Sequence, residues 1–250
     1  MMDYRALATD YDGTLAQDGR VDDDTLTALQ HWQQSGRKLI LITGRLLDDL
    51  QTVFPPITLF DWIVAENGAL LYQPATQTEK LIATRPSDAF INTLRDRLQA
   101  AQQDLSATAS EEFPFLIKNR LFSPLSVGKV MVATWQPYDA IAQDLIQEMH
   151  LEIQIILNKG AVMLLPTGID KAAGLRAVAH ELDVGLEAIV GLGDAENDLA
   201  FLEISGFSIA VANALPEVKQ RVDWVTTAER GAGVIEAIQK IASSKTVPPS

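Results

Sequence analysis

Short apolar runs alternate along the chain with amphipathic stretches, and this alternation predicts the secondary structure. Continuous apolar runs such as 38–42 and 62–65 are typical of strands that are covered on both faces of a parallel sheet. Between such runs, apolar residues recur at helical spacing, as Leu29 and Trp32 do in the predicted helix 23–35. This succession of strands and helices predicts an α/β fold with a doubly wound, Rossmann-like parallel-sheet core.

The middle of the chain follows a different order. A predicted helix at 87–103 is followed by extended segments, one of them at 113–118, then by a helix at 138–150 and two strands. This order is typical of a small α+β domain inserted into the core. The sequence therefore predicts core segments at 1–83 and 166–243, an α+β cap domain at 84–165 and a disordered tail at 244–250.

Composition narrows the range of partners. The 250 residues are 47% hydrophobic, which is enough to bury a sizeable core, and they carry a formal net charge of −13. Such a charge opposes nonspecific binding to nucleic acid or to anionic lipid. The chain has no cysteine, no long apolar stretch and no signal-peptide pattern at its N-terminus. We therefore expect a cytoplasmic protein without nucleic-acid or membrane partners; the oligomeric state is not predicted.

Two carboxylates follow the first apolar run. Asp10 and Asp12 come directly after Ala6-Leu7-Ala8, and residues two apart in an extended segment project to the same side. Two neighbouring anions need a cation or a shared proton, so the pair can serve one metal ion or one small ligand. Asp-Gly is also common in hairpin turns, and the pair alone does not decide between these interpretations.

Three further polar segments stand at predicted strand ends or helix starts, as the two aspartates do. They are Thr43-Gly44-Arg45, Lys171 and the segment 193–198. Ligands of open α/β sheets bind outside the carboxyl ends of the strands, so all four groups can converge there. Gly191-Leu192-Gly193 also begins like a dinucleotide-binding loop, but Glu196 stands in place of its third glycine.

These motifs carry a family resemblance. They read D-Y-D-G-T-L at 10–15, I-T-G-R at 42–45, G-I-D-K at 168–171 and G-D-A-E-N-D at 193–198. In this order and spacing the chain resembles the haloacid dehalogenase-like hydrolase superfamily, in particular its Cof-like branch, whose type IIB cap is inserted late. The resemblance implies a phosphatase that hydrolyses small phosphomonoesters such as sugar phosphates.

The resemblance also implies a role for each motif residue. Asp10 attacks phosphorus and forms an aspartyl-phosphate, while Asp12 protonates the leaving oxygen and later activates the hydrolytic water. Splitting the reaction in this way replaces one difficult step by two easier ones. Oxygen ligands without cysteine favour a hard cation, most simply Mg²⁺. The implied metal ligands are Asp10, the backbone carbonyl of Asp12 and Asp194. The implied phosphate contacts are Thr43, the Gly44 amide at a helix N-terminus, Lys171 and Asn197, with Asp198 in support.

Several points stay open at the level of sequence. A phosphosugar mutase would use the same two aspartates, and a phospho-accepting signalling module also has an acidic pocket, a hydroxyl residue and a lysine. Arg45 either supports its loop or touches the substrate. A cap domain can exclude water and contact the leaving group. The cap residues that we single out for this role are Lys118, Asn119, Arg120, Lys129 and Trp135.

Overall fold

The structure is a computed structural model that describes residues 4–107 and 124–243. The chain divides into two compact units, one formed by residues 1–82 and 169–250, the other by residues 83–168. We call them the core unit and the insert unit. The predicted segment 113–118, the cap residues Lys118, Asn119 and Arg120, and the predicted tail 244–250 lie outside the described residues.

The core unit is built on a mixed sheet of eight strands within the described part of the chain. Their order is β12-β11-β10-β1-β2-β3-β4-β5. The parallel strands are β1 (Ala6–Asp10), β2 (Lys38–Ile42), β3 (Trp62–Ala65), β10 (Ile189–Gly193), β11 (Phe207–Ala210) and β12 (Trp224–Val225). The antiparallel strands at one edge are β4 (Leu70–Gln73) and β5 (Thr78–Leu81). The predicted doubly wound α/β core is confirmed.

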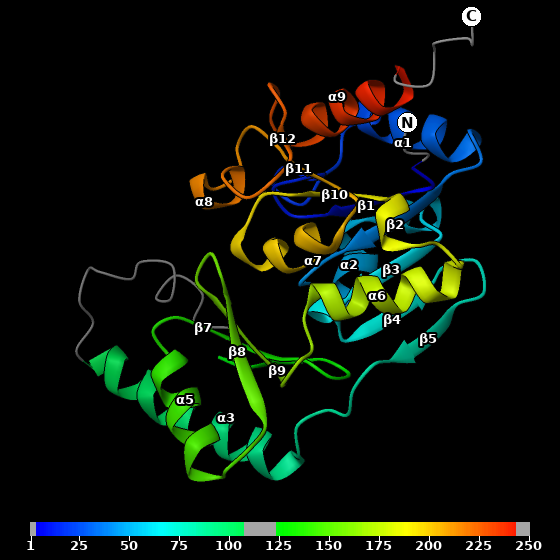
Figure 1. Ribbon diagram of the computed structural model, residues 1–250. Helices are drawn as coiled ribbons and strands as arrows, with labels where there is room; N and C mark the ends of the chain where they lie inside the picture. The colour runs from blue at the N-terminus through cyan, green and yellow to red at the C-terminus, as the bar shows by residue number, and fades with distance from the viewer. Residues whose placement is uncertain (1–3, 108–123, 244–250) are drawn as a thin grey trace, which may run out of the picture. The chain divides into compact units, whose positions relative to one another are not determined.

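Helices cover both faces of this sheet. Helices α1 (Asp23–Gln34) and α9 (Arg230–Ser243) pack together on one face, and α6 (Lys171–Leu182) and α7 (Leu199–Ile204) on the other (Figure 1). The short helices α2 (Leu47–Val53) and α8 (Pro216–Lys219) complete the set of α-helices described in this unit. The apolar stripe predicted for residues 23–35 faces the core as expected, since Leu29 and Trp32 of α1 are buried.

The sequence pattern did not predict β5. All four of its residues are exposed, so the strand has no apolar face from which it could be recognised. It lies at the edge of the sheet, where a strand needs only one neighbour, and here that neighbour is β4.

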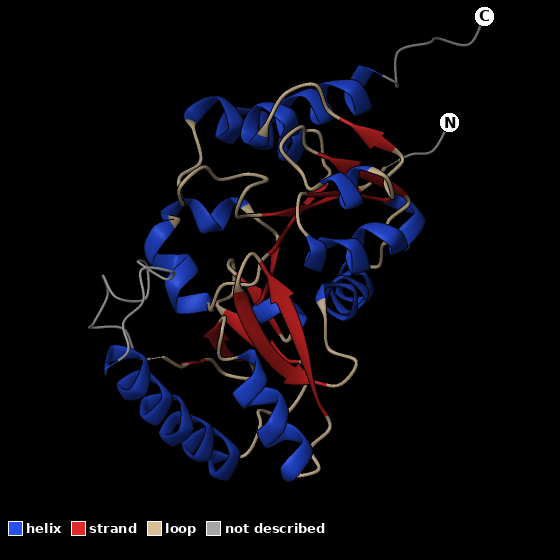
Figure 2. Ribbon diagram, turned by 90° about the vertical axis from the view of Figure 1, so that its left-hand side faces the viewer, coloured by secondary structure: helices blue, strands red, loops and turns tan. Residues whose placement is uncertain are grey.

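The insert unit places two helices against a small antiparallel sheet, as the blue and red ribbons of Figure 2 show. The elements described in this unit are α3 (Asp88–Ala107), β6 (Ser126–Val127), β7 (Val132–Trp135), α5 (Asp139–Glu148), β8 (Ile153–Asn158) and β9 (Ala161–Pro166). The sheet order is β6-β7-β9-β8. Phe90 and Leu94 of α3 and Leu145 of α5 share one apolar cluster with Val162 and Leu164 of β9.

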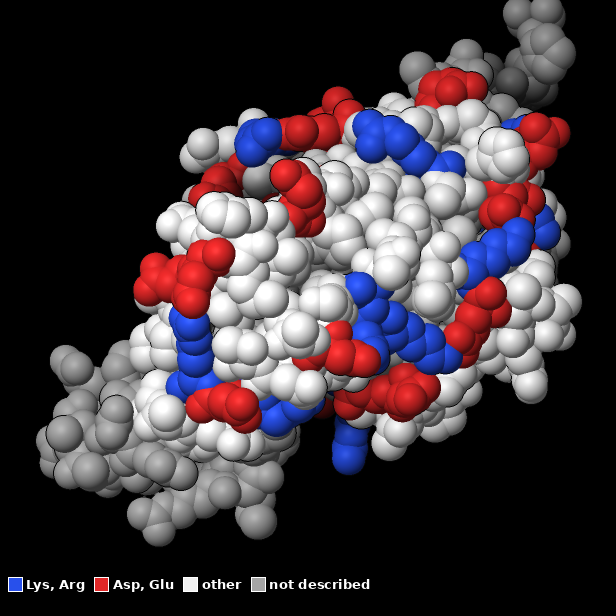
Figure 3. Space-filling view, turned by 90° about the horizontal axis from the view of Figure 1, so that it is seen from below, with Lys and Arg blue, Asp and Glu red and all other residues white. Residues whose placement is uncertain are grey.

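The surface carries charges of both signs. On the face drawn in Figure 3, Lys and Arg side chains lie beside Asp and Glu side chains. Exposed side chains of opposite charge also form ion pairs, such as Arg97 with Glu148 at 2.7 Å. Within the described ranges, every helix is too short or too polar to cross a membrane.

Candidate active site

The polar residues of the site follow the carboxyl ends of four adjacent parallel strands. Asp10 is the last residue of β1, Thr43 follows β2, Glu66 follows β3 and Asp194 follows β10. Because these strands pair in parallel as neighbours, their ends lie along one edge of the sheet. Asp10, Thr43, Glu66 and Asp194 are all buried. This edge is where the sequence predicted that the motifs would converge.

A buried lysine joins two of the predicted aspartates. The Lys171 ammonium donates hydrogen bonds to Asp10 Oδ1 at 2.6 Å and to Asp198 Oδ1 at 2.5 Å. The side chain of Lys171 is 1% exposed, and those of Asp10 and Asp198 are 7% and 0% exposed. Residues that are distant in sequence are thereby brought into one ion-paired network.

The start of α6 explains the position of this lysine. The Asp170 side chain accepts a hydrogen bond from the Ala173 amide at 2.8 Å and caps the helix, which begins at Lys171. Gly174 lies so close to β3 that a Cβ atom there would stand 2.3 Å from Val64 Cγ1. The glycine therefore lets the first turn of α6 approach the sheet closely, which buries the lysine at the strand ends.

Burial and charge act against each other on these groups. Burial alone would lower the pKa of Lys171, but the charges of Asp10 and Asp198 outweigh it and raise the pKa above its ordinary value. Lys171 therefore stays charged, as its predicted contact with phosphate requires. The pKa of Asp10 is raised well above its usual range by burial and by the charge of Asp198, which outweigh the opposing attraction of Lys171.

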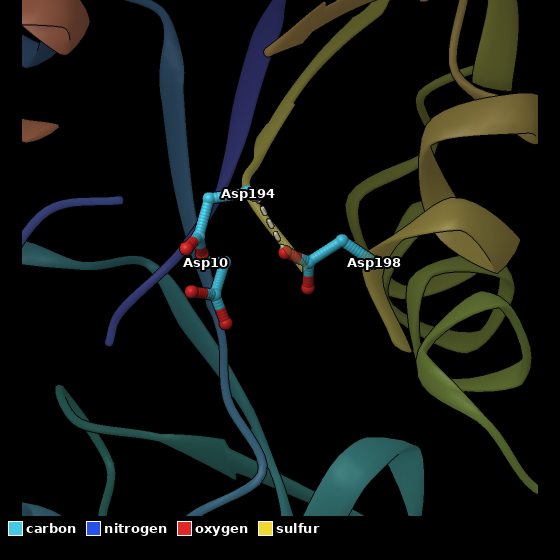
Figure 4. A group of neighbouring side chains, drawn as sticks. All are labelled: Asp10, Asp194 and Asp198. Carbon is cyan, nitrogen blue, oxygen red and sulfur yellow. Dashed lines mark hydrogen bonds between the residues drawn. The ribbon is translucent and has the colours of Figure 1, made fainter. Parts of the chain in front are cut away.

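Asp194 and Asp198 are held by a tight turn after β10. Asp198 Oδ2 accepts hydrogen bonds from the backbone amides of Asp194 at 2.8 Å and Ala195 at 2.9 Å. Asp194 Oδ1 accepts a hydrogen bond from the Thr14 hydroxyl at 3.1 Å. The carboxylates of Asp10, Asp194 and Asp198 each offer an oxygen within 4.8 Å of the others (Figure 4).

This cluster fits the hard cation that the sequence predicted. Three buried carboxylates stand against the single charge of Lys171 in the network, and carboxylate oxygens are the ligands that Mg²⁺ prefers. Asp198 is already engaged through both oxygens, by the lysine and by two backbone amides. Asp10 and Asp194 are therefore the better candidates for metal ligands, and the backbone carbonyl of Asp12 stays a prediction.

The structural context of Asp12 differs from the one that the sequence predicted. Strand β1 ends at Asp10, so the strand alternation from which the sequence predicted a common direction for the two side chains does not extend to Asp12. The carboxylate of Asp12 instead accepts two hydrogen bonds from Arg45, from Nε at 2.7 Å and Nη2 at 2.8 Å. Arg45, whose role the sequence left open, thus contacts a predicted catalytic residue.

The loop after β2 also departs in part from its prediction. Thr43 is buried, and its hydroxyl oxygen accepts a hydrogen bond from the Arg45 amide at 3.1 Å. The prediction placed the Gly44 amide at a helix N-terminus, but α2 begins only at Leu47. Gly44 therefore belongs to the loop between β2 and α2.

Asn197 has a partner that the sequence did not suggest. Its Nδ2 donates a hydrogen bond at 2.9 Å to Oδ1 of Asn67, in the turn after β3. Both asparagines are buried. The sequence assigned Asn67 only to a turn, although its place after a parallel strand, as with Thr43, was a signal that could have marked it.

A family model described as haloacid dehalogenase-like hydrolase matches residues 7–113 and 117–238. The chain belongs to this family. A phosphoglycolate phosphatase of Methanothermobacter thermautotrophicus is 27% identical over 94% of this chain and 98% of its own length. Phosphoglycolate phosphatase 2 of Saccharolobus solfataricus is 38% identical over 95% of this chain and 92% of its own.

Solved structures agree on the fold. A haloacid dehalogenase-like hydrolase from Bacillus subtilis has a TM-score of 0.72 and 17% identity, and the match covers 94% of this chain and 99% of the other. A subclass IIB sugar phosphatase of the same superfamily has a TM-score of 0.69 and 17% identity, with 95% and 99% covered. The resemblance that the motifs predicted, to the Cof-like branch of the haloacid dehalogenase-like hydrolases, is confirmed by the family model, and the solved structures agree with it in fold.

Two of the predicted cap residues lie in the described part of this hydrolase's insert unit. Trp135, at the end of β7, is 42% exposed. Lys129 is exposed in the turn between β6 and β7. Their proposed contact with the substrate stays a prediction.

Proposed function

We propose that the chain is a Mg²⁺-dependent phosphatase that hydrolyses small phosphomonoesters through an aspartyl-phosphate on Asp10. The observation that carries the proposal is the buried contact of Asp10 with Lys171, beside the carboxylates of Asp194 and Asp198. It combines a carboxylate nucleophile, a fixed positive charge and a candidate cation site at one strand edge. Family membership and the phosphatase names of the relatives support the same reaction.

The reaction proceeds in two displacements on phosphorus. An Asp10 carboxylate oxygen forms a bond to phosphorus as the bond to the leaving oxygen breaks, and Asp12 gives that oxygen a proton. Asp12 then takes a proton from water, whose oxygen attacks the aspartyl-phosphate and releases inorganic phosphate and the Asp10 carboxylate. General acid and base help of this kind is worth about 10²–10⁴-fold in rate.

Charge neutralisation is the second requirement of phosphoryl transfer. Lys171 supplies a fixed positive charge beside the nucleophile, and Asp198 holds the lysine in place. Mg²⁺, held by Asp10 and Asp194 with the predicted Asp12 carbonyl, would neutralise charge on the phosphoryl oxygens. The proposed contacts to the phosphoryl group are Thr43 and the Gly44 amide, in the loop after β2, and Asn197, in the 3₁₀-helix Glu196–Asp198 after β10.

Arg45 adds a positioning role to this scheme. Its guanidinium contacts both oxygens of Asp12 and also donates to Asp49 at 2.6 Å. Two parallel hydrogen bonds from a planar guanidinium fix the orientation of a carboxylate. We infer that Arg45 orients the Asp12 carboxylate after Asp12 has given its proton to the leaving oxygen and before Asp12 takes a proton from water.

The substrate class rests on the relatives. Several are named phosphoglycolate phosphatases, and one from Bacillus subtilis is named for 5-amino-6-(5-phospho-D-ribitylamino)uracil. These are phosphomonoesters with small, polar leaving groups. We propose that this chain acts on the same class, which includes phosphoglycolate and the sugar phosphates that the motifs suggested.

A screen of phosphorylated metabolites tests the proposal. The purified chain is incubated with Mg²⁺ and phosphoglycolate, sugar phosphates or phosphorylated pyrimidine precursors, and released phosphate is measured. We expect repeated turnover on at least one substrate, loss of activity with EDTA and its return with added Mg²⁺. Isomerised sugar phosphate without free phosphate would indicate a mutase, and a single phosphorylation without turnover would indicate a signalling module.

A further inference from the structure

Asn67 is a buried residue in an uncommon backbone conformation at the edge of the proposed site. It has φ 53° and ψ 35°, in the left-handed region, where residues other than glycine are uncommon and asparagine is enriched. It is 0% exposed. A turn alone would be satisfied by glycine, which adopts this conformation without steric cost. The side chain therefore needs a separate explanation.

The contacts of Asn67 connect it to the proposed phosphate-binding residues. Its backbone amide donates to the Thr43 carbonyl at 2.9 Å, and its Oδ1 accepts from Asn197 Nδ2 at 2.9 Å. The next residue, Gly68, packs against the start of α6, where a Cβ would stand 1.8 Å from the Asp170 carbonyl oxygen and 3.0 Å from the Lys171 amide nitrogen. Asn67 thus adjoins all three elements that carry Thr43, Asn197 and Lys171.

The amide pair retains unused hydrogen-bonding capacity. Nδ2 of Asn67 and Oδ1 of Asn197 are buried and have no partner. Buried polar groups are normally satisfied, and leaving them unpaired costs stability. Rotating both side-chain amides by 180° would only exchange the donor and acceptor roles of the two asparagines. In either arrangement the pair keeps one unpartnered amide nitrogen beside the residues that are proposed to bind phosphate.

We propose that Asn67 is a further phosphoryl-binding residue, which acts as a pair with Asn197. The pair donates a side-chain amide hydrogen bond to a phosphoryl oxygen that the other proposed contacts leave unsatisfied. Asn67 also fixes Asn197, because the hydrogen bond between them leaves neither amide free to rotate alone. This inference rests on the proposed phosphatase function and assigns a residue of that same site.

The variant Asn67→Gly tests the inference directly. Glycine keeps the left-handed backbone and the amide that donates to Thr43, and it removes only the side chain. The probe is inorganic phosphate with Mg²⁺, and its binding is measured by calorimetry and as product inhibition. A lost hydrogen bond to a charged group corresponds to about 10–100-fold weaker binding. We expect a loss in this range, with the same far-ultraviolet circular dichroism as the wild type.

Asp183→Gly is the matched control. Asp183 also has a left-handed backbone, with φ 50° and ψ 49°, but it caps the C-terminal end of α6. The variant Asp183→Gly should leave phosphate binding unchanged. Asn67→Asp is the second variant, because aspartate keeps the shape and tolerates the same backbone conformation. Its negative charge should weaken phosphate binding at least as much as glycine does.

The outcomes distinguish a failure of the inference on Asn67 from a failure of the proposed phosphatase function. If the wild type turns over phosphomonoesters and both Asn67 variants bind phosphate within twofold of it, this inference is wrong and the proposed function stands. If Asn67→Gly does not fold, Asn67→Asp alone decides by the same criterion. If the wild type itself neither releases nor binds phosphate, the proposed function fails, and the inference fails with it.

Discussion

Asp10 and Asp12 stand two residues apart, yet their carboxylates lie in opposite environments. The Asp10 side chain is 7% exposed and contacts the ammonium of Lys171, whereas the Asp12 side chain is 44% exposed and contacts the guanidinium of Arg45. A shielded carboxylate beside a point charge suits attack on phosphorus. A half-exposed carboxylate suits proton exchange with a leaving group and with water. These different environments are consistent with the two different roles that we propose for Asp10 and Asp12.

Removal of the nucleophile should have the largest effect on activity. Asp10→Asn keeps the size of the side chain but replaces an attacking oxygen by an amide, so no aspartyl-phosphate can form. We expect phosphate release to fall at least about 10³-fold, because nucleophile substitutions commonly cost this much or more. Steady-state kinetics with Mg²⁺ and the best substrate of the screen measure the effect.

The control for this variant is Asp18→Asn, which makes the same chemical change at an exposed position of the core unit. It should retain wild-type activity. Phosphate release by Asp10→Asn at more than about a tenth of the wild-type rate would contradict the assignment of the nucleophile.

The variant Lys171→Met tests the environment of the buried carboxylate, that of Asp10. Lys171→Met leaves the carboxylates of Asp10 and Asp198 buried without their shared cation. Removal of one partner from a buried ion pair costs about 3–5 kcal/mol, so we expect a loss of that order in the free energy of unfolding, together with loss of activity. Urea denaturation without added metal measures the first effect.

Lys80→Met is the matched exposed control. Lys80 pairs with Glu181 at 2.5 Å, but its side chain is 46% exposed and that of Glu181 29%. Such pairs contribute about 0–1 kcal/mol. Equal destabilisation by the two variants would show that the buried network of Asp10, Lys171 and Asp198 is no tighter than a surface ion pair.

The variant Arg45→Met tests the environment of the exposed carboxylate, that of Asp12. Arg45→Met removes both hydrogen bonds to Asp12 but no reacting group. We expect kcat to fall about 10–100-fold, within the range that general acid and base catalysis contributes, and KM to change little, since Arg45 is proposed to orient Asp12 rather than to bind substrate. Arg85→Met, which removes an exposed pair with Asp88 in the insert unit, is the control. A larger change in KM than in kcat would instead indicate direct contact with the substrate.

The sequence predicted the backbone of the site better than its side-chain contacts. Strands β1, β2 and β10 each contain a short apolar run, at 6–8, 39–42 and 189–192, so their ends, and with them Asp10, Thr43 and Asp194, could be placed at one edge. The contact between Asn67 and Asn197 joins residues 130 positions apart. Asn67 precedes Gly68, and the dipeptide Asn-Gly is typical of turns. This local pattern was sufficient to account for Asn67 and Gly68 without a long-range contact. The two amides meet only because β3 and β10, which precede them, end at the same edge of the sheet.

The smallest expected effect belongs to a carboxylate of the core unit that has no proposed role in the reaction. Asp22 caps α1 and accepts hydrogen bonds from the Thr25 amide and hydroxyl, both at 2.8 Å. Asp22→Ala should leave kcat unchanged and lower the free energy of unfolding by about 1 kcal/mol, the usual cost of losing an N-cap. Thermal and urea denaturation at neutral pH measure this difference, and Asp24→Ala, at the second residue of the same helix, controls for the lost charge.

The pH dependence of this cap provides a sharper test. Although partial burial acts to raise it, the hydrogen bonds from Thr25 lower the pKa of Asp22 below its ordinary value. A lowered pKa in the folded state means that the stabilising effect is complete above the ordinary aspartate pKa of about 4. It is lost as the pH falls through the lower, folded-state value. The stability difference between wild type and Asp22→Ala should therefore be constant near neutrality and shrink in acid. A difference that grows on acidification would mean that the carboxylate stabilises α1 in its protonated form, contrary to the contacts with Thr25.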